Sequence, residues 1–117
     1  MAGACSVILK SVFDETALIA NCVHASPDGL SLMPCPESFT PTIGAEVNKL
    51  SFNVAMGRNW AGIHYRSDAI GGIRLGEEVG ISILQDLARC CTEDFAGFAF
   101  TRYDGTPVTI NRNGEVS

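Results

Sequence analysis

The sequence of 117 residues has few charged and few aromatic residues, and it lacks a long apolar run. Charged residues make up 18% and aromatic residues 8% of the chain, whereas apolar residues make up 46%. No charge-free apolar stretch approaches the roughly 18 residues that span a bilayer. The N-terminus lacks the basic, apolar and small-residue regions of a signal peptide. These absences predict a soluble globular protein, assigned by default to the cytoplasm, with no membrane partner.

Basic residues are scarce and scattered. Eight Lys and Arg stand against 13 Asp and Glu, which gives a net charge of −5 and a pI near 4.8. Because nucleic acids and anionic membranes attract basic surfaces, this balance argues against both as partners. The mean hydropathy of +0.18 is high for a small domain. We therefore expect exposed apolar helix faces, covered in a homo-oligomer or by sequence outside this chain.

The five cysteines follow neither a disulfide framework nor a metal-binding pattern. They lie at positions 5, 22, 35, 90 and 91, an odd count without CxxC or Cys/His ligand spacing. We expect free, mostly buried thiols with no role as metal ligands. A thiol-redox function for the adjacent pair Cys90 and Cys91 is disfavoured because the pair lacks the CxxC spacing of redox motifs.

Hydrophobic periodicity predicts three helices. Apolar residues recur at helical spacing in residues 2–15, 42–63 and 69–91. The first of these segments opens on its apolar stripe without a capping residue, whereas Ser67 and Asp68 form an expected N-cap pair for the third. The predicted apolar faces comprise Cys5, Ile8, Leu9, Val12 and Phe13, then Val47, Leu50, Val54, Ala55 and Ile63, and then Ile70, Ile73, Val79, Ile83, Leu84 and Leu87.

Glycines at every fourth position mark one side of the third predicted helix. Gly72, Gly76 and Gly80 leave this side without side chains, which predicts the close approach of another backbone. Glu77 and Glu78 are interpreted as a solvated face of the same helix.

The remaining segments predict a loop and a hairpin. Residues 21–41 contain four prolines, which exclude a helix interior and indicate a long Pro/Ser loop. In residues 95–110 apolar residues flank the turn pair Asp104-Gly105, which predicts a β-hairpin, and Asn113-Gly114 suggests a last turn. The predicted fold is mainly α: a helical bundle fragment of about three helices with a long Pro/Ser loop and a C-terminal β-hairpin, in one partial domain spanning residues 1–117.

Three residues at the junction of the second and third predicted helices form a candidate oxyanion site. Arg58, His64 and Asp68 follow the spacing Arg-x5-His-x3-Asp. Arginine presents a planar fork of donors that suits a tetrahedral oxyanion. A carboxylate four residues after a histidine can reach its ring and fix the tautomer, which leaves the other nitrogen free. The alternative is a surface ion pair between Arg58 and Asp68 beside a partly buried, satisfied His64.

Other polar and aromatic residues are less informative. His24 lies in the Pro/Ser loop and is interpreted as a surface residue. Trp60 and Tyr65 flank the candidate site, where they could line a pocket or pack in the core.

The segment GRNWAGIHYRSDAIGGIRLGEEVGISIL resembles the third signature motif of the superfamily of vanadium-dependent haloperoxidases and type 2 phosphatidic acid phosphatases. That motif reads Ser/Gly-Arg-x5-His-x3-Asp, and Gly57, Arg58, His64 and Asp68 match it. The tail GFAFTRYDGTPVTI is similar to soluble haloperoxidase-like members.

The resemblance implies a role for each matching residue. It implies that Arg58 binds the oxygens of vanadate or phosphate and that Asp68 orients His64. For His64 it implies either ligation of vanadium, as vanadate, or nucleophilic attack on phosphorus in a phosphatase without a cofactor. Both chemistries use the same residues and stay open, although the absence of membrane spans disfavours a lipid phosphatase.

Two other motifs of the superfamily are absent. Neither Lys10 nor Lys49 begins the pattern Lys-x6-Arg-Pro, and Pro-Ser-Gly-His, which carries the acid/base histidine, does not occur. We therefore expect a C-terminal fragment of a haloperoxidase-like or acid phosphatase-like enzyme that is inactive or weakly active alone. The alternative is a non-catalytic, oligomerising helical module with at most weak phosphate binding.

Overall fold

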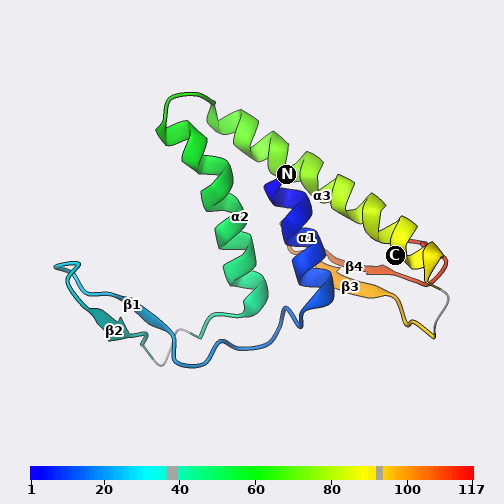
Figure 1. Cartoon of the computed structure of the whole chain (residues 1–117), viewed down its shortest axis with the longest axis horizontal. Helices are drawn as coiled ribbons and strands as arrows, with labels where there is room; N and C mark the ends of the chain where they lie inside the picture. The colour runs from blue at the N-terminus through cyan, green and yellow to red at the C-terminus, as the bar shows by residue number, and fades with distance from the viewer. Residues whose placement is uncertain (37–39, 92–93) are drawn as a thin grey trace.

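The computed structural model describes residues 1–36, 40–91 and 94–117, and this part of the chain forms three helices and two antiparallel hairpins (Figure 1). β1 pairs with β2, and β3 pairs with β4. The predicted mainly α architecture is confirmed, with more β structure than expected. None of the described helices is long and apolar enough to cross a membrane. In chain order the elements are α1 (Ala2–Val12), β1 (Val23–Ala25), β2 (Leu32–Pro34), α2 (Ile43–Trp60), α3 (Arg66–Cys90), β3 (Phe98–Thr101) and β4 (Pro107–Ile110).

The starts of α2 and α3 are fixed by side chains that accept hydrogen bonds from backbone N–H groups. Thr42 Oγ1 accepts the N–H of Ala45 at 3.1 Å. α3 begins at Arg66 with Tyr65 as its N-cap, and the Asp68 carboxylate accepts the N–H of Tyr65 at 3.0 Å. The predicted Ser67-Asp68 N-cap pair is therefore wrong, because Asp68 acts from inside the first turn of the helix.

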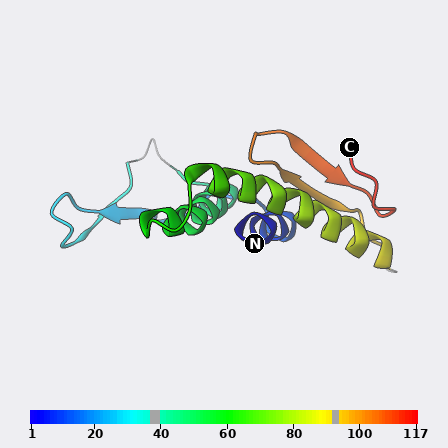
Figure 2. The ribbon, with the colours of Figure 1, turned by 90° about the horizontal axis from the view of Figure 1, so that it is seen from above.

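The core lies where α3 packs against α1 and against the β3–β4 hairpin. Seen from above in Figure 2, α1 and this hairpin lie on either side of α3, and α1 also contacts β3 directly. α1 and α3 approach closely, since a Cβ added at Gly80 would lie 2.9 Å from Cβ of Val7, and one at Gly76 only 3.0 Å from N of Ala4. The predicted close approach is confirmed for these two glycines, whereas Gly72 faces open space. The buried core residues are Val7, Ile81, Leu84, Ala88, Phe100, Val108 and Ile110.

The helices bury different faces from those predicted. α1 buries Gly3, Ser6, Val7 and Lys10, while most of its apolar stripe faces outward, with Val12 66% and Phe13 54% exposed. Small residues on the buried side let α3 come close, and this contact decides which face is covered. α2 buries Gly44 and Ser51, whereas its predicted apolar face stays largely exposed. Of the face predicted for α3, Ile73 and Leu84 are buried, but Ile70, Val79, Ile83 and Leu87 are 40–50% exposed.

A buried polar cluster joins α1 and α3 to the C-terminal hairpin. Lys10 is 1% exposed, and its Nζ donates to the carbonyl of Thr101 and lies 4.8 Å from the ring centroid of Tyr103. Burial lowers the pKa of Lys10, and the charges of Glu15 and Glu77 oppose that shift. Glu77 is 6% exposed and accepts the N–H of Tyr103 at 2.8 Å. The prediction of a solvated Glu77 is therefore wrong, because the hairpin covers it.

The predicted C-terminal hairpin and its turns are confirmed. Gly105 has φ +89°, a left-handed conformation that glycine adopts without strain, and the Asp104 carboxylate accepts the N–H of Thr106 at 2.9 Å. In the last turn Gly114 has φ +75° and donates its N–H to the carbonyl of Asn111 at 2.8 Å.

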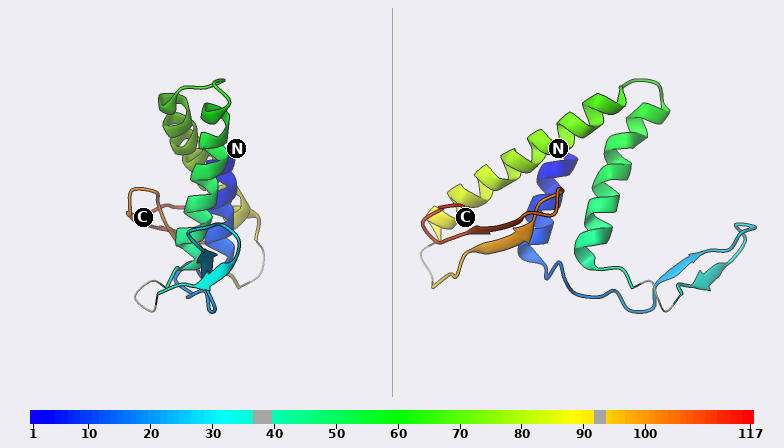
Figure 3. Two further views of the ribbon diagram at one scale, coloured as in Figure 1. Left: turned by 90° about the vertical axis from the view of Figure 1, so that its left-hand side faces the viewer. Right: turned by 180° about the vertical axis from the view of Figure 1, so that it is seen from behind.

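The Pro/Ser segment contains an antiparallel ribbon, β1–β2, that the sequence did not predict. In its register His24 lies opposite Met33, and none of its strand residues is buried. Figures 1 and 3 show it extending beyond the end of α2, away from β3 and β4. The residues 37–39 of the predicted loop lie outside the described part of the chain.

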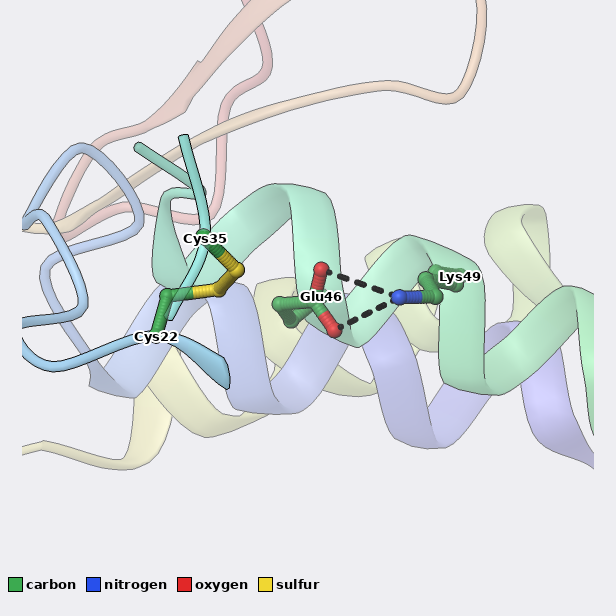
Figure 4. The surroundings of a disulfide bond; sticks show 4 residues. All are labelled: Cys22, Cys35, Glu46 and Lys49. Carbon is green, nitrogen blue, oxygen red and sulfur yellow. Dashed lines mark hydrogen bonds and ion pairs between the residues drawn. A yellow bond between two sulfur atoms is a disulfide. The ribbon is translucent and has the colours of Figure 1, made fainter. Parts of the chain in front are cut away.

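A disulfide between Cys22 and Cys35 closes the base of this ribbon (Figure 4). The Cα atoms of the two cysteines are 5.4 Å apart, because the strand register places them opposite each other. The prediction of free, buried thiols is therefore wrong for this pair. It is also wrong about burial for the free thiols of Cys5, Cys90 and Cys91, which are exposed.

Reduction of the disulfide is expected to melt the β1–β2 ribbon without unfolding the core. A two-stranded hairpin without a buried face is marginally stable alone, and a cross-link closing a loop of this size contributes about 3 kcal/mol in the chain-entropy view. Replacing Cys22 and Cys35 with serine should therefore speed amide hydrogen exchange in residues 23–34 while α3 and β4 keep their protection. Replacing Cys90 and Cys91 with serine is the matched control, and loss of protection in α3 of the first variant would contradict the expectation.

Candidate oxyanion site

The turn between α2 and α3 brings Arg58 and His64 to one end of the helix pair. Arg58 lies in the last turn of α2, and its carbonyl accepts the N–H of Ile63 at 3.2 Å. Gly62 has φ +72° and donates its N–H to the carbonyl of Asn59 at 2.9 Å. A glycine fits this left-handed position without strain, so the chain reverses within a few residues.

Asp68 holds a position beside the imidazole of His64. Its Oδ2 lies 3.6 Å from Nδ1 of His64 and also accepts the backbone N–H of Tyr65. Both side chains are about half exposed, at 43% for His64 and 51% for Asp68. Among the described residues no hydrogen bond engages Nε2 of His64. The 3.6 Å separation is longer than a hydrogen bond, so Asp68 lies beside the ring and leaves Nε2 open to a ligand.

Arg58, His64 and Asp68 line one pocket of about 330 Å³. The structure therefore brings the three sequence-predicted site residues together. The first residues of α1, namely Met1, Ala2 and Gly3, also line this pocket, and α1 has no side-chain cap. The remaining walls are Val54, Ala55, Ala69, Gly72 and Ile73.

The sequence did not predict that α1 lines this pocket, because that depends on how the helices pack together. The first backbone N–H groups of a helix have no partner within the helix, and they carry the positive end of its dipole. An anion in the pocket would lie near the guanidinium of Arg58 and the imidazole of His64.

The other candidate residues lie elsewhere. His24 is exposed on β1, as predicted for a surface residue. Trp60 is 78% and Tyr65 81% exposed, and neither lines the pocket. Both interpretations of these aromatics, as pocket walls or as core residues, are therefore wrong.

The donor set of the pocket suits a tetrahedral oxyanion. A guanidinium fork and an imidazole nitrogen can bind the oxygens or the central atom of such an ion. By class, the chain is a mainly α-helical protein whose helix junction forms a pocket of this kind.

Curated proteins of similar sequence show which enzymes the chain is related to. The chain is 40% identical over 110 residues to the vanadium-dependent bromoperoxidase of Corallina officinalis and 39% identical over 110 residues to that of Corallina pilulifera. It is 36% identical over 92 residues to the vanadium-dependent bromoperoxidase of Ascophyllum nodosum. These similarities confirm the predicted kinship with the vanadium-dependent haloperoxidase superfamily. No family model matches the chain.

The chain spans a small part of these relatives. The match to the Corallina officinalis protein covers 94% of this chain and 18% of that protein, and the match to the Ascophyllum nodosum protein covers 79% and 16%. The chain thus corresponds to under a fifth of the length of the curated relatives it matches.

Proposed function

We propose that the chain, as a single partial domain, carries the Arg58, His64 and Asp68 part of the oxyanion site of a vanadium haloperoxidase-like enzyme. The observation that supports this most is the meeting of the three side chains in one pocket at the α2–α3 turn. The similarity of the surrounding sequence to vanadium-dependent bromoperoxidases supports the choice of chemistry.

Each residue has a role in this proposal. Arg58 would offer parallel N–H donors to the oxygens of the ion, and Nε2 of His64 would be its nitrogen ligand. Asp68, at 3.6 Å from Nδ1, keeps the ring in the orientation that this contact needs. The donor set fits vanadate, which when bound would supply a Lewis-acidic centre for halide oxidation by peroxide. Phosphate has the same shape, so Arg58 and His64 suit it as well.

The chain by itself is expected to have little or no activity. One positioned acid/base group contributes typically about 10²–10⁴-fold to a rate. The Pro-Ser-Gly-His pattern, which supplies such a histidine in the superfamily, does not occur in the sequence, and neither does Lys-x6-Arg-Pro. Binding of the oxyanion is therefore the sharper test of the proposal.

Arg58→Ala is expected to weaken vanadate binding about 10–100-fold, because a hydrogen bond to a charged group contributes about 1.5–3 kcal/mol. Titration of the chain with orthovanadate, followed by vanadium NMR, measures this change. His64→Ala should have an effect of similar size. Arg74→Ala is the matched control, since Arg74 lines a different pocket on α3. Equal affinities for Arg58→Ala and Arg74→Ala, or no binding at millimolar vanadate, would refute the proposed site.

Turnover assays distinguish the two chemistries. Bromide oxidation with peroxide and vanadate reports the haloperoxidase reaction, and hydrolysis of p-nitrophenyl phosphate reports the phosphatase reaction. Robust turnover by the chain alone that His64→Ala abolishes would show that it is a complete enzyme.

A non-catalytic oligomerising module is a second candidate. The exposed apolar residues on α1 and α2 favour it, since Leu50 is 59% and Val12 66% exposed. Light scattering would then show a stable oligomer, and vanadate would bind weakly or not at all.

The disulfide between Cys22 and Cys35 is relevant to the cellular compartment in which the protein is expected. Structural disulfides persist in oxidising environments and are rare in the cytosol. The pairing of Cys22 with Cys35 therefore favours an oxidising compartment over the cytoplasm predicted by default.

A further inference from the structure

The β1–β2 ribbon places four side chains of metal-binding types on one face. In its antiparallel register His24 lies opposite Met33. Cys22 and Cys35 form the pair nearer the base, where the N–H of Cys35 donates to the carbonyl of Cys22 at 2.8 Å. Side chains two positions apart on a strand share a face, so the two pairs lie on the same side of the ribbon. This face therefore presents two cysteine sulfurs, an imidazole and a thioether.

The two pairs lie close enough for their side chains to share one metal ion. The Cα atoms of Cys22 and Cys35 are 5.4 Å apart. Metal–sulfur bonds of about 2.3 Å and metal–nitrogen bonds of about 2.0–2.1 Å require donor atoms within about 4 Å of one another. Successive pairs on one face are about 7 Å apart along the strand, a distance that an imidazole and a flexible thioether side chain can span. None of the strand residues is buried, so His24 and Met33 have room to turn toward the cysteines.

The disulfide closes this face to metals. The thiolate is the form of cysteine that binds a metal, and the sulfurs of Cys22 and Cys35 are bonded to each other instead. Accordingly, the described residues include no group of three or more His, Cys, Asp or Glu side chains arranged to hold a metal ion. A dithiol reductant would transfer two electrons and two protons to the two sulfurs and would itself become a disulfide, which leaves two thiols in the ribbon.

The donor types on this face indicate copper(I). Thiolate and thioether sulfurs select Cu(I), and imidazole is also a copper ligand. Zinc sites use Cys, His, Asp and Glu, so Met33 would not serve one. Figure 4 shows Glu46 of α2 in the surroundings of the disulfide, but its carboxylate pairs with Lys49 at 3.3 Å. The thioether of Met33 is therefore favoured as the fourth donor.

We propose that reduction of the disulfide opens a Cu(I) site on the β1–β2 ribbon, whose ligands are Cys22, His24, Met33 and Cys35. On binding, the two thiols release their protons to solvent and the copper keeps its oxidation state. The ion takes the place of the disulfide as the link between the strands. Because a two-stranded ribbon without a buried face is marginally stable alone, the ion should restore the order that reduction removes.

Copper binding is measured after the cysteines outside the ribbon are removed. Serine replaces Cys5, Cys90 and Cys91, which leaves Cys22 and Cys35 of the five cysteines in the chain. Anaerobic reduction uses a phosphine, which takes an oxygen atom from water to become its oxide while the disulfide receives two electrons and two protons. After the phosphine is removed, titration with Cu(I) in competition with the chelator bicinchoninate should show one ion per reduced chain. The disulfide-linked chain should take up none.

Single substitutions test the two ligands other than cysteine. His24→Ala and Met33→Leu should each weaken Cu(I) binding about tenfold or more, since even the loss of a residue that only supports a ligand costs about 10–100-fold in affinity. Val23→Ala is the matched control and should leave the affinity nearly unchanged, because Val23 lies on the other face. Exchanging two neighbours, Leu32→Met with Met33→Leu, moves the thioether to that other face and should weaken binding as much as Met33→Leu alone.

Amide hydrogen exchange gives a readout that does not depend on the chelator. Cu(I) should slow exchange in residues 23–34 of the reduced chain, and to a larger extent than Zn(II). If His24→Ala binds Cu(I) as tightly as Val23→Ala, the ion is held by the thiolates alone and the four-ligand site is refuted. A larger effect of Zn(II) than of Cu(I) would overturn the choice of metal. Unchanged exchange in residues 23–34 on addition of Cu(I) would overturn the placement of the site on the ribbon.

Discussion

Glu77→Ala is expected to lower the free energy of unfolding by about 1–3 kcal/mol, the cost of leaving a buried donor without its acceptor. Glu77 is 6% exposed, and its charge opposes the effect of burial on the pKa of Lys10, which is 1% exposed. Its removal leaves the ammonium of Lys10 buried with less compensation. The N–H of Tyr103 also loses its acceptor, and Arg102 loses a carboxylate 3.7 Å away. Urea denaturation followed by circular dichroism measures the change.

Glu78→Ala is the matched control for this prediction. Glu78 is the adjacent residue and also pairs with Arg102, but its side chain is 60% exposed. Exposed ion pairs contribute about 0–1 kcal/mol, so a small loss is expected. The double variant Lys10→Met with Glu77→Ala should lose less than the sum of the single variants, because it also removes the buried ammonium whose burial the charge of Glu77 opposes. Equal losses for Glu77→Ala and Glu78→Ala would contradict the interpretation.

The buried cluster that contains Lys10 and Glu77 predicts that the free energy of unfolding changes with pH in the alkaline range. Burial holds the pKa of Lys10 below its ordinary value of 10.5. Between the folded and unfolded pKa values the native state binds fewer protons than the unfolded state, so stability rises with pH across this window. Glu77→Ala removes a charge that raises the pKa of Lys10, and its stability deficit should therefore shrink as the pH approaches 10.5.

Gly3→Ala is expected to lower the free energy of unfolding by about 1–3 kcal/mol through overpacking of the α1–α3 contact. A Cβ at Gly3 would lie inside van der Waals contact of the carbonyl oxygen of Ile73 and 3.2 Å from the backbone N of Glu77. Because both neighbours are backbone atoms of α3, a side-chain rotation cannot relieve the contact. The helices would have to separate, which would expose Val7, now fully buried.

Gly71→Ala is the control, since a Cβ there meets nothing within 4 Å. Alanine is preferred to glycine in a helix by roughly 0.5–1 kcal/mol, so this variant should be slightly more stable than the parent. Thermal and urea unfolding should show a loss of stability for Gly3→Ala and a small gain for Gly71→Ala. A stabilised Gly3→Ala variant would show that α1 and α3 are packed less closely than the structure has them.

The sequence predicted the elements better than their buried faces. The positions of α2, α3 and the hairpin at Asp104-Gly105 follow from local signals, which are periodicity, capping and turn chemistry. Which face of a helix is buried depends instead on its neighbours. In α1 the small residue Gly3 turns toward α3, and the apolar Val12 and Phe13 turn outward. The hydrophobic periodicity of α1 does not indicate which of its faces is buried.

The candidate site, too, could be predicted only in part from the sequence. Arg58, His64 and Asp68 were predicted together because one short turn joins their helices, so spacing in sequence fixes spacing in space. The residues of α1 that line the same pocket lie more than fifty positions away, and only the fold brings them there. The pairing of Cys22 with Cys35 depended in the same way on a strand register that the prolines of the segment concealed.

The tip of the β1–β2 ribbon can change in length without disturbing the helices. Its tip, which includes Asp28 and Leu30, is exposed and closed by local hydrogen bonds such as that from Leu30 N–H to Asp28. Lengthening a surface loop costs little, because each doubling of its length adds only about 0.6 kcal/mol of closure entropy. Evolution can therefore add or remove residues at this tip, and an experimenter can insert an epitope or a fluorophore there, while the disulfide at its base keeps the change away from the helices.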